Sequence, residues 1–296
     1  MNINDITNIK RSYLVLIGGA EDKTGSKEIL AKTVKVARAK RIVVIPTASN
    51  YPRDVYNNYY NAFRDLGVEE IECFDIRDPR EADQERYFEY LKDTNLVFFS
   101  GGDQVKLVET LRNTNLLEEI SKRFFSGTLT IAGTSAGAAA ASDIMLYDGD
   151  YRGFVKGRVR SCPGFGFLPK ITIDTHFLHR ERIPRLVQIL TSSENLNTRG
   201  IGLDENTAIL IGPNLKCLTI GTGMVTLVNT ESVTFSDYNY IDNDKIYSVN
   251  NLKIGFLAPG TMFSLKRWSI LKSNQIKKKY FELIPEYEDQ INMFFN

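Results

Sequence analysis

Cysteine and histidine are scarce in this sequence. Three cysteines (Cys73, Cys162 and Cys217) and two histidines (His176 and His179) occur among 296 residues. The cysteines lie far apart and form no Cys-x-x-Cys motif, which argues against a disulfide scaffold and a structural zinc site. Two histidines offer little from which to build a metal centre, so we expect no metal and no cofactor. If a histidine performs chemistry here, only these two positions can supply it.

Excess charge and long apolar runs are also absent. Lys and Arg total 37 against 36 Asp and Glu, and the net charge of +1 disfavours nucleic acid as a partner. No apolar run approaches the roughly 18 residues of a membrane span. Residues 1–5 lack the basic-then-apolar pattern of a signal peptide. We therefore expect a cytoplasmic protein without membrane contact.

Short β-type runs alternate with amphipathic stretches through the first two thirds of the chain. Continuous apolar strands separated by helices favour a parallel sheet covered on both faces. The expected strands are 13–17, 41–45, 71–74, 96–99 and 128–132, and the expected helices are 26–39, 54–66 and 81–92. From about Gly200 onward, turn-separated runs predict antiparallel strands that extend the sheet, at 208–211, 217–220, 224–228 and 233–235.

No polar linker divides the chain. Residues 1–296 are therefore expected to form a single α/β domain with a core over about 11–267. Residues 268–296 carry Lys277, Lys278 and Lys279 and are expected to form a helix or an appendage.

Four of the early strands end in segments of small or polar residues. If the strands are parallel, these segments gather at one edge of the sheet, where sites of open α/β sheets lie. They are residues 18–21, 46–49, 100–104 and 133–137. Their convergence predicts a functional site at that edge.

Residues 133–137 read Gly-Thr-Ser-Ala-Gly, a G-x-S-x-G motif between a strand and the small-residue run 138–141. This is the context of a nucleophile elbow, in which small neighbours let the chain turn sharply and present the serine. Ser135 is therefore the candidate nucleophile. The amide of Ala136, at a helix N-terminus, can bind developing negative charge. The alternative is a tight turn in which Ser135 caps the helix.

A serine nucleophile needs a base. His176 follows the strand-like run 171–173 and so lies beyond a strand end, as the elbow does, whereas His179 is one turn further and is expected to face solvent. The carboxylate that orients the imidazole stays open at this point. The candidates are Asp148, Asp150, Asp174, Asp204 and Glu205.

The order of motifs resembles that of the cyanophycinases, serine exopeptidases related to aspartyl dipeptidases. The resemblance runs from about residue 11 to about residue 267. It is carried by Gly18–Glu21 (GGAE), Ile45–Ser49 (IPTAS), Phe99–Gln104 (FSGGDQ), Gly133–Ala138 (GTSAGA), Asp174–Phe177 (DTHF) with Arg180, Arg182 and Arg185, Gly202–Ala208 (GLDENTA) and Leu257–Gly260 (LAPG).

The resemblance implies a fold and an activity. The family has a flavodoxin-like α/β fold, a mostly parallel sheet flanked by helices, and is usually dimeric, so a homodimer is expected. Its substrate is cyanophycin (multi-L-arginyl-poly-L-aspartate), which it hydrolyses through an acyl-enzyme to β-Asp-Arg dipeptides.

The resemblance also implies roles for individual residues. Ser135 would be the nucleophile, His176 the base, and Glu205, which matches the acid of the family's Asp-Glu pair, the orienting acid. The oxyanion hole would be the amides of Gly102 and Ala136. The substrate cleft would be lined by Gln104, Asp174, Thr175, Arg180, Arg182 and Arg185.

The chemistry of this cleft suits a substrate that carries both signs of charge. Arginine recognises carboxylates with a fork of donors, and Asp174 can receive a guanidinium. Alternatively, the arginines solvate a helix and pair with Glu181. Glu21 and Asp22 either reach the cleft or cap the helix that follows them.

One position departs from the family, since Thr175 stands where the family commonly has glutamine. A threonine is shorter, so one substrate contact is expected to be lost or replaced by water, and the exact substrate stays open.

Two other functions use parts of the same residue pattern. A dipeptidase for N-terminal aspartyl or isoaspartyl peptides needs the same elbow and base with a smaller pocket. A catalytically silent binding protein or an amidotransferase-like partner is disfavoured, because Ser135 and His176 are both present and no cysteine stands at the elbow.

Overall fold

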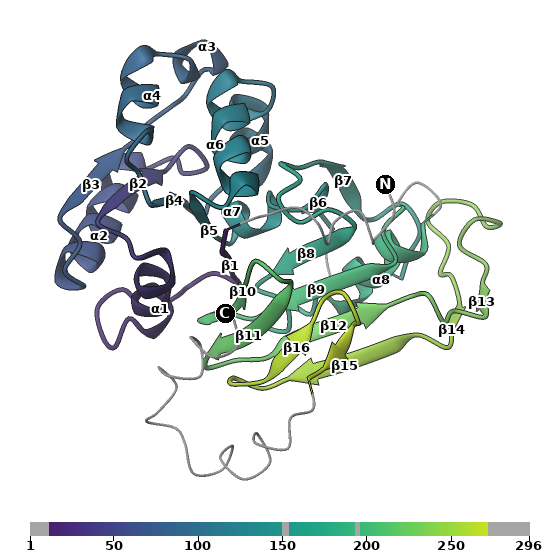
Figure 1. Ribbon diagram of the computed structural model, residues 1–296. Helices are drawn as coiled ribbons and strands as arrows, with labels where there is room; N and C mark the ends of the chain where they lie inside the picture. The colour runs from purple at the N-terminus through teal and green to yellow at the C-terminus, as the bar shows by residue number, and fades with distance from the viewer. Residues whose placement is uncertain (1–11, 150–153, 193–195, 272–296) are drawn as a thin grey trace, which may run out of the picture.

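A nine-stranded mixed sheet forms the centre of the computed structural model, which describes residues 12–149, 154–192 and 196–271 (Figure 1). Its strand order is β17-β16-β11-β10-β1-β5-β4-β2-β3. Five neighbouring strands are parallel: β1 (Leu14–Ile17), β2 (Arg41–Ile45), β3 (Glu70–Cys73), β4 (Leu96–Phe99) and β5 (Thr130–Thr134). The predicted α/β class, with a mostly parallel central sheet, is confirmed.

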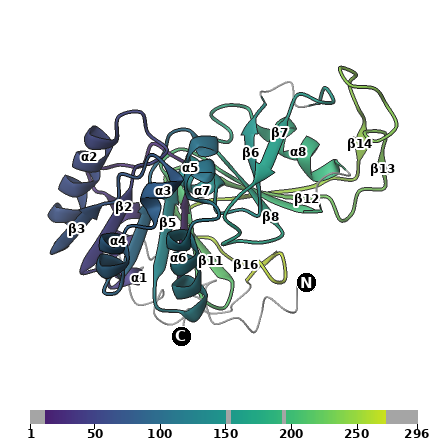
Figure 2. The ribbon, with the colours of Figure 1, turned by 90° about the horizontal axis from the view of Figure 1, so that it is seen from above.

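Helices cover both faces of the parallel strands, which is why these strands are almost wholly apolar. One face packs against α1 (Glu28–Ala37) and α2 (Pro52–Asp65). The other face packs against α4 (Glu85–Leu91), α5 (Gln104–Leu111) and α6 (Asn115–Ser126). Figure 2 shows α2 on one side of the strands and α4 and α6 on the other. The helices α5 and α6 were not predicted.

The helix predicted over 81–92 is two helices, α3 (Pro79–Ala82) and α4. The break lies at Asp83, whose carboxylate accepts hydrogen bonds from the Asn115 side chain at 2.7 Å and from the Leu116 backbone at 3.2 Å. A contact with a helix more than thirty residues further along therefore overrides the local helical spacing.

Antiparallel strands extend the sheet beyond β1. The runs predicted at 208–211 and 217–220 are β10 (Thr207–Ile211) and β11 (Lys216–Gly221), whereas β16 (Met262–Ser264) and β17 (Ser269–Ile270) were not predicted.

The strand predicted at 224–228 does not extend that sheet. It is β12 (Val225–Asn229), and it belongs to a second, four-stranded sheet of order β15-β12-β9-β8. The other members are β8 (Ile171–Thr175), β9 (Arg199–Leu203) and β15 (Lys253–Leu257). This second sheet was not predicted, because strand pairing between distant segments leaves no local pattern in a sequence.

Two short ladders complete the strands. The run predicted at 233–235 contributes only Phe235 to β13 (Phe235–Ser236), which pairs with β14 (Val249–Asn250). The other ladder pairs β6 (Ile144–Asp148) with β7 (Arg160–Pro163).

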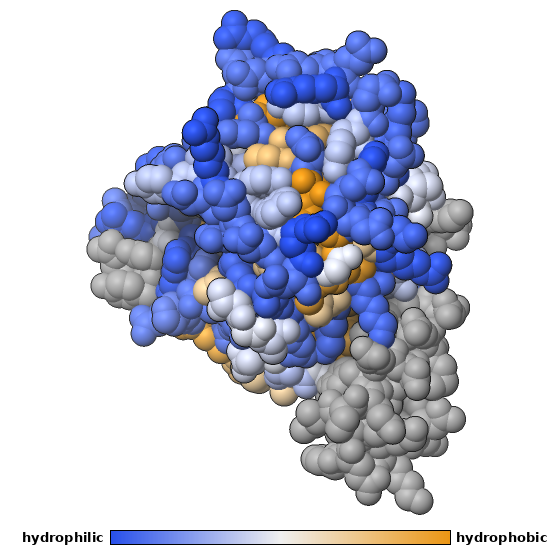
Figure 3. Space-filling view, turned by 90° about the vertical axis from the view of Figure 1, so that its left-hand side faces the viewer, coloured by the Kyte–Doolittle hydropathy of each residue, from blue (hydrophilic) through white to orange (hydrophobic). Residues whose placement is uncertain are grey.

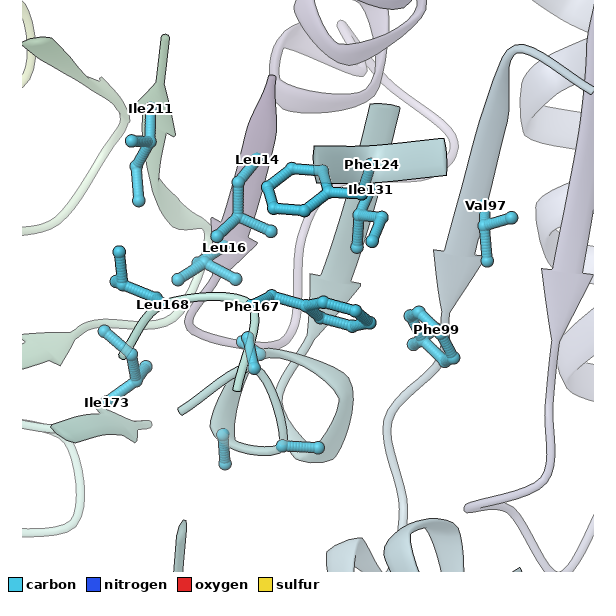
Figure 4. Close-up of a cluster of buried hydrophobic side chains, with 14 of the residues drawn as sticks. Leu14, Leu16, Val97, Phe99, Phe124, Ile131, Phe167, Leu168, Ile173 and Ile211 are labelled. Atoms are coloured by element: carbon cyan, nitrogen blue, oxygen red, sulfur yellow. The ribbon is translucent and has the colours of Figure 1, made fainter. Parts of the chain in front are cut away.

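The two large sheets share one hydrophobic core. Leu14 and Leu16 of β1 and Ile173 of β8 belong to one buried cluster, and Phe167 and Leu168 lie between them (Figure 4). The helix α8 (Ile183–Thr191) covers the opposite face of the second sheet. The positions of the two sheets are therefore coupled, and so are the strand ends that they present.

The outer edge of the large sheet is protected by charge. Its last strand, β3, exposes Glu70 and Glu72, and charged side chains of this kind discourage edge-to-edge pairing. The face seen in Figure 3 is mainly hydrophilic, with apolar residues in a narrow stripe.

In the described ranges no helix is long and apolar enough to cross a membrane. The predicted appendage over 268–296 lies outside the described residues from residue 272 onward, which includes Lys277, Lys278 and Lys279.

Candidate active site

Ser135 lies in the sharp turn between β5 and α7 (Ala136–Ala139). Its backbone has φ 49° and ψ −107°, a sparsely populated conformation that persists only when the surrounding structure enforces it. A hydrogen bond from the Ser135 amide to the Ile17 carbonyl, 2.9 Å long, helps to hold it there. The side chain makes no capping hydrogen bond to α7, so the helix-cap alternative is not what the structure shows.

Three side chains form a hydrogen-bonded chain at this turn. The Ser135 Oγ lies 2.8 Å from His176 Nε2, and His176 Nδ1 lies 2.6 Å from Glu205 Oε1. A neutral imidazole that donates from Nδ1 to the carboxylate leaves Nε2 free to accept the serine proton. The arrangement is that of a nucleophile, a base and an orienting acid.

The three hydrogen-bonded residues come from both sheets. Ser135 follows β5 of the large sheet, whereas His176 follows β8 and Glu205 follows β9 of the second sheet. β8 and β9 are parallel neighbours with Thr175 opposite Leu203, so their following residues emerge side by side. The shared core then sets how far this pair lies from Ser135.

Among the carboxylates that the sequence left open, Glu205 is the one that contacts His176. Asp204 instead accepts backbone hydrogen bonds from Leu178 (2.8 Å) and Met224 (3.1 Å). Asp148 accepts from the amide of Gly149 at 2.8 Å. Asp174 is occupied by Arg185, as described below, and Asp150 lies outside the described residues.

The imidazole sits against the loop that follows β1. The His176 amide donates to the Gly18 carbonyl at 2.9 Å. A Cβ on Gly19 would lie 2.4 Å from His176 Cε1, and Gly19 has φ 106°. Only glycine therefore lets the backbone approach the ring this closely.

Burial and neighbouring charges shift the pKa values of His176 and Glu205. Burial lowers the pKa of His176 below its ordinary value of 6.5, the Glu205 hydrogen bond opposes that shift, and the charge of Arg180 adds to it. The hydrogen bond with His176 lowers the pKa of Glu205. At neutral pH the imidazole is therefore uncharged beside an ionised carboxylate, as a base requires.

The loop after β4 lies beside Ser135. A Cβ on Gly101 would be 3.3 Å from the Ser135 Cβ, and one on Gly102, which has φ 141°, would be 2.2 Å from the Ala48 carbonyl oxygen. Within the described ranges, no protein acceptor receives a hydrogen bond from the amides of Gly102 and Ala136. Both amides are thus available to a ligand near Ser135.

A buried cluster of charges adjoins His176. Asp174 accepts from Arg185 through both oxygens, Nε to Oδ2 at 2.9 Å and Nη2 to Oδ1 at 2.5 Å. Arg182 Nη1 lies 3.6 Å from Asp174 Oδ1 and donates to the Thr175 carbonyl at 2.7 Å. Burial lowers the pKa of Arg182 to about 10, which leaves it charged at neutral pH. One carboxylate thus faces two guanidinium groups.

The other predicted cleft residues are placed differently. Gln104 donates to the carbonyls of Leu146 and Tyr147 at 3.1 and 3.4 Å. The Thr175 side chain is buried, whereas Arg180 and His179 are exposed. Arg180 is therefore the cleft arginine that solvent reaches most freely, and Asp174 has its oxygens engaged by protein arginines.

Neither Glu21 nor Asp22 caps α1 with its side chain, and Glu21 is buried against Thr134 and does not line an open cleft. Asp22 accepts from the amides of Thr24, Gly25 and Lys27 and so organises the turn before α1. Glu21 points inward and is 3% exposed. Its carboxylate contacts Thr134 of β5, Tyr59 of α2 and Lys23, and no local sequence pattern predicts contacts between such separate segments.

Several known proteins and one family model are similar to this chain. The model of Peptidase family S51 matches residues 14–214. A cyanophycinase of Geminocystis herdmanii is 32% identical over 260 residues, which cover 86% of this chain and 94% of that protein. A cyanophycinase of Trichormus variabilis is 32% identical over 265 residues, 88% of each chain. A crystal structure of a peptidase from an acI-B1 Actinobacterium has the same fold, with a TM-score of 0.65 at 22% identity over 86% of this chain and 97% of that one.

Proposed function

This chain belongs to peptidase family S51 and is a serine-type peptidase, and from that premise we propose that it hydrolyses cyanophycin to β-Asp-Arg dipeptides. The nucleophile is Ser135, the base is His176 and the orienting acid is Glu205. The observation that supports these roles most directly is the unbroken hydrogen-bonded chain from Ser135 to Glu205 at a strained elbow.

The reaction begins with the attack of Ser135 on a backbone carbonyl of the substrate. His176 Nε2 takes the hydroxyl proton as the Oγ–C bond forms, and Glu205 stabilises the imidazolium. The amides of Gly102 and Ala136 receive the negative charge that develops on the carbonyl oxygen. The imidazolium then gives its proton to the leaving amine as the C–N bond breaks, which leaves an acyl-enzyme.

Water completes the cycle. His176 accepts a proton from water, the hydroxide attacks the ester carbon, and the proton passes to Ser135 Oγ as the ester bond breaks. The product leaves with a new carboxylate and the serine is restored.

The charge of the cleft suits an aspartyl substrate. Arg182 and Arg185 share the single carboxylate of Asp174, so guanidinium groups outnumber carboxylates in this cluster, and Arg180 is exposed nearby. We propose that Arg180 and Arg182 attract substrate carboxylates, since guanidinium groups recognise them with forked donors. Asp174 and Arg185 then position Arg182, which also donates a hydrogen bond to the Thr175 carbonyl. Gln104 lines the cleft beside β6.

Incubation of the purified protein with insoluble cyanophycin, followed by mass analysis of the soluble products, tests this proposal. Release of β-Asp-Arg is the expected result. A substrate series of increasing length separates the competing activity, because only a polymer enzyme gains strongly from longer chains. Cleavage confined to short aspartyl or isoaspartyl peptides would favour the dipeptidase alternative and direct attention to Thr175.

Glu205→Gln is expected to lower kcat by about 10²-fold or more, because an amide cannot stabilise the imidazolium and favours the wrong tautomer. Steady-state kinetics on the polymer measure the effect. Asp204→Asn is the matched comparison. It should reduce the free energy of unfolding by about 1–3 kcal/mol, since its two backbone hydrogen bonds are weakened, with a much smaller loss of kcat. The opposite order of the two kcat losses would make Asp204 the acid.

The pH profile should reflect the ionisation of His176. Because the base must be neutral and its pKa is lowered, kcat/KM should rise with pH through a point below pH 6.5 and be level at neutral pH. Removing the charge of Arg180 (Arg180→Gln) should move this rise to higher pH, and Glu205→Gln should move it to lower pH. Rate measurements from pH 4.5 to 8 check all three proteins, and a rise that stays in place in both variants would contradict this assignment of the base.

A further inference from the structure

One short loop contacts His176 directly, and it contacts the chain neighbours of Ser135 and Glu205. This loop, residues 18–22 after β1, is called the β1 loop below. The Ser135 amide donates to Ile17 just before it, and the His176 amide donates to Gly18. Gly19 lies against the imidazole and its carbonyl accepts from the amide of Asn206, the neighbour of Glu205, at 2.8 Å. The Asp22 amide donates to the Asn206 side chain at 3.0 Å. Residues that follow strands of both sheets thus meet at the β1 loop.

Glu21 anchors the β1 loop beneath the elbow. Its Oε2 accepts from the hydroxyl of Thr134, the residue before Ser135, at 2.5 Å. Its Oε1 accepts from the hydroxyl of Tyr59 on α2 and lies 3.0 Å from Lys23 Nζ. The Glu21 and Thr134 side chains are almost fully buried, whereas Lys23 is partly exposed and also lies over the Tyr59 ring, 5.0 Å from its centroid.

The contacts of Glu21 matter because a buried carboxylate is costly unless it is hydrogen-bonded or paired with a cation. Here its donors come from β5, from α2 and from the loop itself, so each is held at a fixed place by a separate element. Moving the carboxylate would leave buried hydroxyl groups without an acceptor. The cluster is therefore a rigid connection from the helix layer, through Glu21, to the residue adjoining the strained Ser135.

From these contacts we propose that Glu21 is a positioning residue for the reaction. It sets the place of Ser135 Oγ relative to His176 by holding Thr134 and the β1 loop together, without touching substrate. This inference rests on the proposed function, since it assumes that Ser135 is the nucleophile. Loss of the connection should lower the reactivity of Ser135 and leave substrate affinity nearly unchanged.

Three substitutions disrupt the connection to different degrees, and two others serve as controls. Glu21→Gln keeps the volume but removes the charge and one acceptor oxygen. Thr134→Val removes only the hydroxyl, and Thr134→Ser restores it, so the pair provides a conservative rescue. Tyr59→Phe removes the other hydroxyl, and Tyr56→Phe is its matched control on the same helix, since the Tyr56 hydroxyl donates to the Ile71 carbonyl at 2.9 Å, away from the β1 loop.

The direct measurement is the rate at which a fluorophosphonate probe labels Ser135, with the labelled residue located by mass spectrometry. It needs no knowledge of the natural substrate. The kcat and KM for cyanophycin and the thermal midpoint of each folded variant are recorded beside it.

Glu21→Gln should slow labelling and lower kcat by about 10–100-fold, the range expected when a reacting atom is displaced by up to about an ångström. Thr134→Val and Tyr59→Phe should lower both by about tenfold or less, with KM within about twofold.

The outcomes distinguish this inference from the proposed function. Thr134→Ser and Tyr56→Phe should label at the wild-type rate even where their thermal midpoints fall. Labelling of Glu21→Gln, Thr134→Val and Tyr59→Phe at the wild-type rate, with Ser135 labelled in the wild type, would overturn the positioning role alone. A slowing in Tyr56→Phe equal to that in Tyr59→Phe would reduce the effect to general destabilisation and overturn it too. Failure of the probe to label Ser135 in the wild type would overturn both.

Discussion

Ser135→Ala is expected to lower the rate of β-Asp-Arg release from cyanophycin by about 10⁴–10⁶-fold, the loss seen when a serine nucleophile is removed from an intact site. No other hydroxyl can replace it, because the strained backbone of this one residue aims its Oγ at His176. Mass analysis of the soluble products over time measures the rate. The thermal midpoint should change little, because alanine keeps the Cβ and the backbone of the turn and removes only one part-buried hydroxyl.

Ser126→Ala is the matched control for this experiment. Ser126 ends α6 and is exposed, and its hydroxyl donates to the Arg123 carbonyl and hydrogen-bonds with the Thr128 hydroxyl. It should retain full activity. Substantial turnover by Ser135→Ala, in a preparation free of other peptidases, would remove Ser135 from the mechanism.

His176→Gln is expected to lower kcat by about 10⁴–10⁶-fold, because glutamine has no group that can take up the serine proton at neutral pH. The loss should appear in both acylation and deacylation, since the same imidazole serves each step. Single-turnover measurement with an activated ester separates the two steps. Neither should recover at high pH within the stable range of the protein.

The chain contains its own control for this substitution. His179 is the other histidine of the sequence, is exposed, and lies three residues further along. His179→Gln should retain activity within about twofold, because the side chain is exposed and is not part of the hydrogen-bonded chain of Ser135, His176 and Glu205. Equal losses in the two variants would show that the pair acts together and would contradict His176 as the single base.

The conservative Glu205→Gln, Asp204→Asn pair and the substitutions around Glu21 probe smaller effects around the same centre. Their value lies in separating residues that share a neighbourhood. Asp204 accepts from backbone amides, Glu205 contacts the imidazole, and Glu21 accepts from Thr134, the residue before Ser135. The three carboxylates thus have three different hydrogen-bond environments, and each should give a different combination of rate and stability changes.

Local sequence determined most of the elements and the family. Apolar β-type runs bounded by Gly and Pro are buried strands wherever they occur, and this is why β1, β2 and β4 lie where their residues predicted. The turn at Ser135 could also be predicted from the sequence, because a sharp strand-to-helix turn needs small residues at fixed places around the serine. The ordered motifs identified the peptidase family, and the match to residues 14–214 confirms it. The roles of Ser135, His176 and Glu205 remain predictions.

Tertiary structure alone decided what those elements bring together. The sequence left five carboxylates open as partners of His176, and pairing of β8 with β9 in a second sheet is what brings Glu205, and not its neighbour Asp204, to the ring. It also turned Asp174 toward Arg185 and Glu21 toward Thr134. The physical reason is the same in each case. A strand or a helix follows from its own residues, whereas hydrogen bonds between separate elements depend on packing distances that no local pattern contains.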